Sequence, residues 1–322
     1  MEIPGIHHVT AISGDASGNV RFYTQTLGLR LVKKTVNQDD VKAYHLFYGD
    51  ETGSPGTEVT FFDWPHSPQT IQGIGTIAPV ALRVPGAAAL AWWEGRLDDL
   101  GVAHGPVEER EGHGVLPLTD PEGQRLELVD DGGRPGGHPW PKSTVPAEHG
   151  ITGVHDVTIT SADPEGTAAV LTRLLGFRQA GVSRLPDGSG TATVYEMGQG
   201  GPGAQVRVIA PDRPTPGMAG IGGVHHVAYR TPTDEEHRRW RERIATAGLS
   251  VTPVIDRYYF RSIYFREPGG ALFEIATDGP GFASDEPVES LGERLALPPF
   301  LEGRRAEIEA DLRPIEVQPA GR

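Results

Sequence analysis

Four segments of the chain begin with a short strand-like run that is followed, about twenty residues later, by a glycine. The runs are GIHHVTAI (5–12), TIAPVALRV (76–84), GVHDVTITS (153–161) and GVHHVAYR (223–230). If His8, Pro79, Asp156 and His226 are equivalent, the distances to Gly28, Gly101, Gly176 and Gly248 are 20, 22, 20 and 22 residues. This regular spacing predicts four copies of one module, each with a helix that ends at a glycine.

Further short runs follow each glycine, and turn residues separate them. They include AYHLFYG, TEVTFFDW, QRLELVD, TATVYEMG, AQVRVIA, SIYFRE and ALFEIAT. Alternating or β-branched runs of this length are typical of strands. Each copy is therefore predicted to be strand–helix–strand–strand–strand. We expect an α+β protein in which four βαβββ modules form two clefts.

Segments rich in glycine and proline separate the copies at 64–75, 130–146 and 210–220, and the middle one is the strongest boundary between tandem halves. We expect one domain over 4–132, with modules one and two, and a second over 151–278, with modules three and four. The repeat stops before a tail at 283–322. Its end resembles a charged amphipathic helix that begins at a proline. This helix would cover either a sheet edge or a second subunit, and in the second case the protein would be a homo-oligomer. No chemistry is expected there.

Composition narrows the classes of partner and cofactor. The formal charge is -14, and no stretch gathers the 29 basic residues into a phosphate-binding patch, so nucleic acid is not expected. There are no cysteines, which leaves His, Asp and Glu as the metal ligands to consider. The first residues, MEIPGIHHVT, do not look like a leader, and no apolar window reaches membrane-spanning length. We expect a cytoplasmic protein without a membrane segment.

The repeat itself selects a set of metal ligands. If the first and last strands of a module line its cleft, the ligands come from equivalent positions on those strands, and only His8 and His226 offer an imidazole on a first strand. Aligning the last strands through the preceding turn places Glu274 opposite Phe61 in module one and Glu127 in module two. Glu274 lies inside the apolar run ALFEIAT, where an unpaired carboxylate is costly. His8, His226 and Glu274 would form the facial triad that suits Fe(II) or Mn(II).

These features resemble the vicinal-oxygen-chelate superfamily of glyoxalases, bleomycin-resistance proteins and extradiol dioxygenases, over about residues 4–280. Three segments resemble the ring-cleaving dioxygenases that act on hydroquinones. They are GIHHVTAISGDASGNVRFYTQTLGLRLVKKTVNQDD, YHLFYGDETGSPGTEVTFF and DRYYFRSIYFREPGGALFEIATDGPGF, of which the last is the most specific. Glyoxalase I relatives generally place a metal ligand in the last strand of both paired modules. Phe61, at that position in module one, cannot bind metal, which weighs against a glyoxalase I activity.

The ligand set implies that module one pairs with module four, as in the resembled family. Modules two and three would then form the other cleft. That cleft would carry Pro79, Asp156 and Glu127 beside an apolar last strand, so it is interpreted as vestigial. We expect one tightly bound metal per chain.

Several neighbours of the triad are candidates for supporting roles. Strand alternation places the members of each His doublet on opposite faces, so His7 and His225 would either orient the ligands or pack as structural histidines. Thr10 should face the same side as His8 and make a hydrogen bond in the pocket. The direction of His45 depends on the register of its strand and is left open.

Two residues of the last module are candidates for contact with the substrate. Tyr264 lies ten residues before Glu274, across a predicted hairpin, and the resemblance places a tyrosine there beside the substrate; ordinary core packing is the alternative. Arg257 would hold a substrate oxygen or an anionic product, or else be a solvated loop residue.

The function expected is ring cleavage of a dihydroxylated aromatic, hydroquinone or catechol in type, with O2 and Fe(II), or Mn(II) in its place. Such an enzyme is a non-haem oxidoreductase. The alternatives are a glyoxalase-like lyase or isomerase and a resistance protein that binds aromatic compounds without turnover. Oxygen consumption separates the first from the other two.

Overall fold

The computed structural model describes residues 1–316, and these residues contain the four predicted modules. Module one comprises β1 (Ile6–Ser13), α1 (Ala16–Arg21) with a π-helical continuation η1 (Phe22–Thr26), β2 (Arg30–Asn37), β3 (Asp40–Gly49) and β4 (Glu58–Asp63). Module two comprises β5 (Ile77–Val84), α2 (Ala87–Leu100), β6 (Glu108–Arg110), β7 (His113–Thr119) and β8 (Arg125–Asp130). Module three comprises β9 (Val154–Thr160), α3 (Pro164–Ala169), η3 (Val170–Leu174), β10 (Arg178–Arg184), β11 (Gly190–Glu196) and β12 (Gln205–Pro211). Module four comprises β13 (Gly223–Thr231), α4 (Asp234–Thr246), β14 (Ile255–Asp256), β15 (Arg261–Arg266) and β16 (Leu272–Thr277).

The four repeated glycines end the module helices, as the spacing predicts. Gly28, Gly101, Gly176 and Gly248 have φ values of +71°, +65°, +82° and +84°. This left-handed conformation stops a helix and favours glycine because a side chain would clash with the backbone. The two modules with the shorter spacing of 20 residues are those whose helix ends in a π-helical turn.

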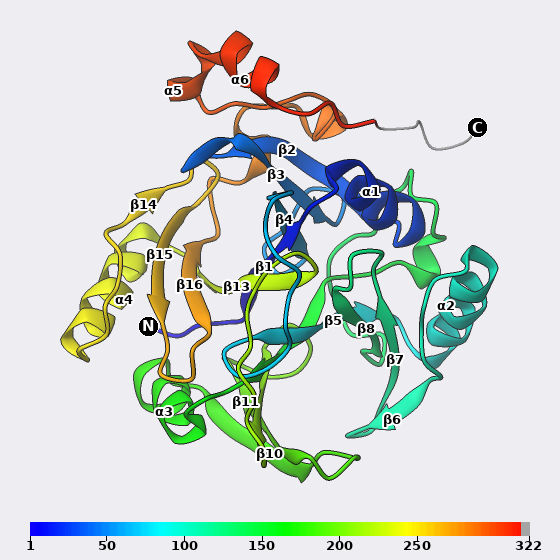
Figure 1. The fold of residues 1–322 in the computed structure, drawn as a ribbon, viewed down its shortest axis with the longest axis vertical. Helices are drawn as coiled ribbons and strands as arrows, with labels where there is room; N and C mark the ends of the chain where they lie inside the picture. Colours follow the sequence, from blue (N-terminus) through cyan, green and yellow to red (C-terminus); the bar gives the residue numbers. More distant parts are fainter. Residues whose placement is uncertain (317–322) are drawn as a thin grey trace.

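The sixteen strands within residues 1–316 form two eight-stranded sheets. One has the order β14-β15-β16-β13-β1-β4-β3-β2 and the other β10-β11-β12-β9-β5-β8-β7-β6 (Figure 1). Module one therefore pairs with module four through the antiparallel strands β1 and β13, which confirms that prediction, and module two pairs with module three. The halves 4–132 and 151–278 remain a proposed division, and each sheet takes one module from each half.

The helices lie on the outer sides of the sheets and bury one face each. Helix α2 packs on β7 and β8, and α4 packs on β13 and β16 (Figure 1). On α4 the buried residues are His237, Trp240 and Ile244, spaced by three and four as expected for one helical face. Large side chains such as Trp93 and Trp240 fill the space between helix and sheet. The inner faces of the curled sheets are left to form the clefts.

A one-residue irregularity interrupts the pairing of β1 with β13 on each strand. Ile6 pairs with Tyr229 and His8 with Ala228, so His7 is an extra residue on β1. Thr10 pairs with His226 and Ala11 with Val224, so His225 is the extra residue on β13. Such bulges re-aim side chains. The expectation that neighbours in each doublet face strictly opposite sides is therefore wrong, and the two rings of each doublet contact each other.

The C-terminal tail covers the edge strand β2, one of the two outcomes expected for it. It contains the short turns η4 (Phe282–Ser284) and η5 (Val288–Ser290), then α5 (Pro299–Glu302) and α6 (Arg305–Asp311) (Figure 1). The single helix expected there is thus two short helices. The amide of Ala296 donates to the carbonyl of Lys34 at 2.9 Å, which extends the sheet edge. Residues 317–322 of the predicted tail lie outside the described residues.

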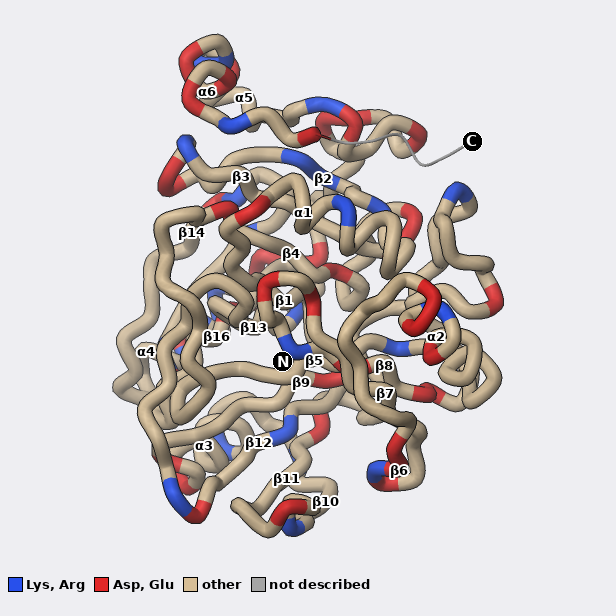
Figure 2. Tube along the Cα trace, turned by 45° about the vertical axis from the view of Figure 1, so that its right-hand side comes forward, with Lys and Arg blue, Asp and Glu red and all other residues tan. Residues whose placement is uncertain are grey.

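Lys and Arg residues are interspersed with Asp and Glu along the trace (Figure 2). No helix within residues 1–316 is long and apolar enough to cross a membrane.

Candidate metal centre and active site

His8 on β1, His226 on β13 and Glu274 on β16 converge at the centre of the first sheet. The Nε2 atoms of His8 and His226 lie 3.3 Å apart, and Glu274 Oε2 lies 3.4 Å from the first and 2.8 Å from the second. All three side chains are buried, and Glu274 is 0% exposed. The strands that carry them are neighbours in the sheet, so the fold brings together residues 218 and 48 positions apart in the sequence.

The donor set fits a divalent transition metal. Glu274 Oε2 is buried and makes no hydrogen bond of good geometry, although both imidazoles are near it. The other oxygen, Oε1, accepts from Ser262 Oγ at 2.5 Å, which fixes the carboxylate. Burial opposes ionisation, but His8 and His226 outweigh it and hold the pKa of Glu274 well below its usual range. The cluster therefore offers two nitrogens and one charged oxygen to a common point, the set typical of Fe(II) and Mn(II) sites.

His7 sets the tautomer of His8. Its Nε2 donates to the carbonyl of Thr277 at 3.1 Å, and burial lowers the pKa of His7 to about 3, so the ring is neutral. A neutral ring that donates from Nε2 accepts at Nδ1, which lies 2.9 Å from Nδ1 of His8. His8 then carries a hydrogen on Nδ1, and its Nε2, which faces His226 and Glu274, is the nitrogen that a metal would bind.

The second doublet repeats the contact between Nδ1 atoms, with His225 in the place of His7. His225 Nδ1 lies 2.8 Å from His226 Nδ1, and burial lowers the pKa of His225 to about 3. A hydrogen on His226 Nδ1 again leaves Nε2 free to bind. Each bulge histidine thus occupies the position of an outer partner that orients a ligand.

A second cluster, His7, His8 and Glu58, also brings three possible metal ligands close together. Burial, followed by the charge of Asp50, raises the pKa of Glu58 well above its usual range, which disfavours the charged carboxylate that a metal ligand needs. Nδ1 of His7 and Nδ1 of His8 are occupied with each other. The triad with Glu274 is the better-formed site.

The position in module one that corresponds to Glu274 is Thr60, and the alignment with Phe61 is wrong by one residue. Glu274 pairs with Ala228, two residues after His226, and Thr60 pairs with Thr10, two residues after His8. Phe61 faces the other side and packs 4.6 Å from Tyr23, centroid to centroid. Register is set by the hydrogen bonds between strands, and a slip of one residue exchanges the two faces.

The second sheet has ion pairs at the equivalent positions. Asp156 Oδ2 lies 2.8 Å from Nδ1 of His155, and Glu127 accepts two hydrogen bonds from Arg110. In module three the position equivalent to Glu274 is Arg207, which pairs with Thr158, two residues after Asp156. A fixed guanidinium repels a cation, so this cleft is unsuited to a metal.

Because the acidic side chains of the second cleft already have partners, we expect one metal per chain. Glu127→Ala should leave that content unchanged, because Glu127 is already paired with Arg110. The measurement is metal per polypeptide after reconstitution and dialysis. A second tightly held metal, or loss of metal on changing Glu127, would mean that the second cleft also binds.

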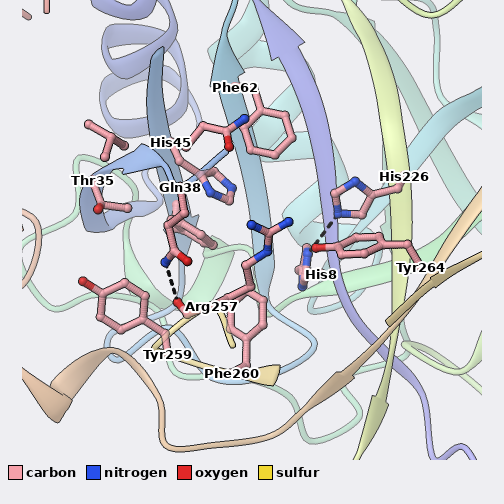
Figure 3. Close-up of a pocket in the computed structure, with 13 residues that line it drawn as sticks. His8, Thr35, Gln38, His45, Phe62, His226, Arg257, Tyr259, Phe260 and Tyr264 are labelled. Atoms are coloured by element: carbon pink, nitrogen blue, oxygen red, sulfur yellow. Dashed lines mark hydrogen bonds between the residues drawn. The ribbon is translucent and has the colours of Figure 1, made fainter. Parts of the chain in front are cut away.

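A narrow pocket opens beside the triad, and aromatic and amide side chains line it. His8 and His226 lie side by side in its lining (Figure 3). The other lining residues are Thr35, Val36, Asn37, Gln38, His45, Phe47, Phe62, Arg257, Tyr259, Phe260 and Tyr264. Walls of this kind suit a flat ring of modest size as a ligand.

Tyr264 and Arg257 both face the triad. Tyr264 pairs directly with Glu274 across the β15–β16 hairpin, and its ring stands 5.5 Å from that of His226. Burial raises the pKa of Tyr264, so its hydroxyl keeps its proton. The Arg257 guanidinium lies 5.6 Å from the Tyr264 ring centroid (Figure 3). Its Nη2 donates to Asp39 at 2.8 Å. Arg257 is therefore a pocket residue and not a free loop cation.

Thr10 and His45 belong to one hydrogen-bonded chain. Thr10 Oγ1 lies 2.8 Å from Thr60 Oγ1, which lies 3.0 Å from Nε2 of His45. Thr10 is fully buried behind Thr60 and does not line the pocket, whereas His45 does. The sequence leaves His45 open because its direction depends on the pairing of β3 with β4. Phe260 and Gln38 lie in segments that carry the family resemblance, but only the fold shows that they line the pocket.

The paired βαβββ sheets and the cluster in their cleft define a class of protein. The family model of the Glyoxalase/Bleomycin resistance protein/Dioxygenase superfamily matches residues 5–128 and 153–275, and the chain belongs to this superfamily.

Relatives within the superfamily match almost the whole chain. MhqA of Bacillus subtilis strain 168, which has the provisional name ring-cleaving dioxygenase, is 46% identical over 318 residues, 98% of this chain and 100% of MhqA. The chlorohydroquinone/hydroquinone 1,2-dioxygenase of Sphingobium indicum is 33% identical, over 96% of this chain and 97% of that protein. A crystal structure of a provisionally named Bacillus subtilis dioxygenase superposes with a TM-score of 0.90 at 40% identity, covering 99% of both chains. Glyoxalase I of Zea mays shares the fold, with a TM-score of 0.62 at 15% identity over 85% of this chain and 92% of its own.

Proposed function

We propose that the protein is a metal-dependent dioxygenase that cleaves the ring of a dihydroxylated aromatic compound with O2. The observation that supports this most is the convergence of His8, His226 and Glu274, two of which line a pocket with aromatic walls. Two imidazoles and one carboxylate leave coordination positions open. The relatives named as ring-cleaving dioxygenases match over nearly their full length, which supports the same reaction class.

The proposed metal is Fe(II), with Mn(II) as the alternative. His8, His226 and Glu274 would hold it. When bound, it would act as a Lewis acid and as a redox centre between the diol and O2. His7 and His225 would keep both Nε2 atoms unprotonated through their Nδ1 contacts.

The remaining pocket residues would bind and orient the substrate. The aromatic walls, including Phe62 and Phe260, would hold the ring and exclude water. Tyr264, which burial keeps protonated, would donate its hydroxyl hydrogen to a substrate oxygen. Arg257 would neutralise negative charge on the diol or on the ring-opened carboxylate, since it is the only Lys or Arg among the described residues that line this pocket.

The site supports this function over the glyoxalase-like alternative. That alternative generally uses a metal ligand from both last strands, and module one has Thr60 at that position, hydrogen-bonded to Thr10 and His45. A threonine hydroxyl held in this way is a poor ligand beside a carboxylate.

The experiment that tests the proposal is reconstitution of metal-free protein without air, followed by an oxygen-electrode assay with hydroquinones and catechols. Fe(II) should restore oxygen uptake that matches loss of the aromatic substrate. Zn(II) should not, because zinc has no redox chemistry. Turnover with zinc and without oxygen uptake would favour a lyase, and substrate binding without turnover under any metal would favour a binding protein.

A further inference from the structure

One wall of the pocket is the loop between β14 and β15, residues 257–260. Arg257, Tyr259 and Phe260 all line the pocket. The Phe260 ring lies 5.2 Å from that of His7 and 5.3 Å from that of His8, so this wall touches a proposed ligand directly.

The same loop contains a backbone conformation that is costly for a large side chain. Tyr258, between Arg257 and Tyr259, has φ of +70°. Non-glycine residues in this region persist where surrounding contacts hold them. The loop closes on itself through one hydrogen bond, from the amide of Arg257 to the carbonyl of Phe260 at 2.9 Å. Other tethers must come from outside the loop.

The β2–β3 hairpin holds Arg257, through Gln38 Nε2 to its carbonyl and Asp39 to its guanidinium, both at 2.8 Å. The tethers of Tyr259 come from the segment directly after the last strand of module four. The amide of Gly281 donates to the carbonyl of Tyr259 at 2.8 Å, and the Tyr259 hydroxyl donates to Asp285 Oδ2 at 2.8 Å. Phe282 packs its ring 5.3 Å from Tyr259 and 4.9 Å from Phe47. Gly281 and Phe282, just before the tail, and Asp285, within the tail where the sequence predicts no chemistry, thus hold the pocket wall.

A buried lysine joins this segment to the opposite wall. Lys33 lies on β2, the strand that also carries the pocket residue Thr35, and its side chain is 0% exposed. Its Nζ donates to Asp285 Oδ1 at 2.7 Å and also to Glu286, and it stands 4.7 Å from the Tyr259 ring centroid. A charge this deep needs its partners, so Lys33 and Asp285 fix each other.

We infer that Tyr259, Asp285 and Lys33 form a positioning network that holds Arg257 and Phe260 at the metal centre, so that residues 281–286 are part of the active site. This inference rests on the proposed function. The three residues act on the substrate through the loop. Loosening the network would free the loop to leave its strained conformation, which would weaken substrate binding without removing a metal ligand.

The test compares Tyr259→Phe with a matched control, Tyr23→Phe. Both variants lose only a buried tyrosine hydroxyl that donates to a carboxylate, and Tyr23 bonds to Asp120 at 3.2 Å outside the pocket. Three properties are measured for each: metal content, amide hydrogen exchange of residues 257–260, and kcat and KM for a hydroquinone with the iron-loaded protein.

Tyr259→Phe should keep its metal, exchange faster at 257–260 and lose about tenfold in kcat/KM, mainly through a higher KM, the factor that corresponds to ~1.4 kcal/mol. Tyr23→Phe should show a comparable loss of thermal stability with neither local change. If Tyr259→Phe does not fold, Asp285→Asn, which removes the charge and keeps the shape, is measured in the same way with the same expectation.

The inference would be overturned if amide exchange at 257–260 in Tyr259→Phe were as slow as in the wild type. It would also be overturned if exchange were faster in that variant but kcat/KM were unchanged. Equal changes in the Tyr23→Phe control would also overturn it, because they would mark a general loss of stability. Failure of the proposed function is distinguishable, since wild-type protein would then show no oxygen-dependent turnover while the exchange experiment still reports on the network.

Discussion

His8→Ala, His226→Ala and Glu274→Ala are each expected to lose the bound metal and ring-cleaving activity while keeping the fold. Each change removes one of three proposed protein ligands. Removing an outer hydrogen-bond partner of a ligand costs about 10–100-fold in metal affinity, so the loss of a ligand should exceed a hundredfold. Metal per polypeptide after dialysis, oxygen uptake and the circular dichroism spectrum of each variant provide the measurements.

The control for these variants lies at the equivalent position of the second sheet. Asp156 corresponds to His8 and His226 in the repeat, and Asp156→Asn should retain the metal because Asp156 pairs with His155. Phe61→Ala should also retain it, since Phe61 faces away from the cleft. Full metal occupancy and turnover in any triad variant would show that the ligand assignment is wrong.

Tyr264→Phe is expected to lower kcat by about 10²–10⁴-fold, the range for loss of a general acid or base. Burial raises the pKa of Tyr264, so wild-type protein should keep this donor throughout the neutral range and lose it only at strongly alkaline pH. Metal content should not change, because the hydroxyl is not a proposed ligand. Steady-state kinetics and metal analysis of the same preparation measure both effects.

The matched control is Tyr195→Phe, a buried tyrosine on β11, the strand of module three that corresponds to β15. It should keep wild-type kcat. Wild-type kcat in Tyr264→Phe would assign Tyr264 to core packing, and loss of metal in that variant would assign it to support of Glu274, with which it pairs.

The module pattern and the pairing of modules could be predicted from the sequence because both depend on local signals. Each helix ends at a glycine with positive φ, and such glycines are visible as a regular spacing. Two imidazoles on first strands and one carboxylate in an apolar last strand then indicate which modules meet. Predicting the pairing of modules in this way requires only the positions of the strands in the sequence, not the register between them.

The register and the bulges could not be predicted. Glu274 lies six residues after the turn proline Pro268, whereas Thr60 lies five after Pro55, so alignment through the turn selects Phe61 where the strand pairing selects Thr60. A prediction that assumes regular strand alternation misses the bulges that bring His7 against His8 and His225 against His226. Both features arise from hydrogen bonds between strands distant in sequence, which leave no local pattern.

The pocket walls were the least predictable part of the candidate site. Gln38 comes from a hairpin turn, and its Nε2 donates to the carbonyl of Arg257, 219 positions away. Asp285 reaches the wall from the tail. These contacts exist only because module one and module four share one sheet and the tail crosses its edge.

The most direct test of the central claim is to locate the metal in crystals of the reconstituted protein by anomalous diffraction at the iron absorption edge. One anomalous peak per chain should lie within coordination distance of Nε2 of His8, Nε2 of His226 and Oε2 of Glu274. A peak between His7 and Glu58, or a peak beside Asp156 and Glu127 in the second sheet, would contradict the site and the function built on it.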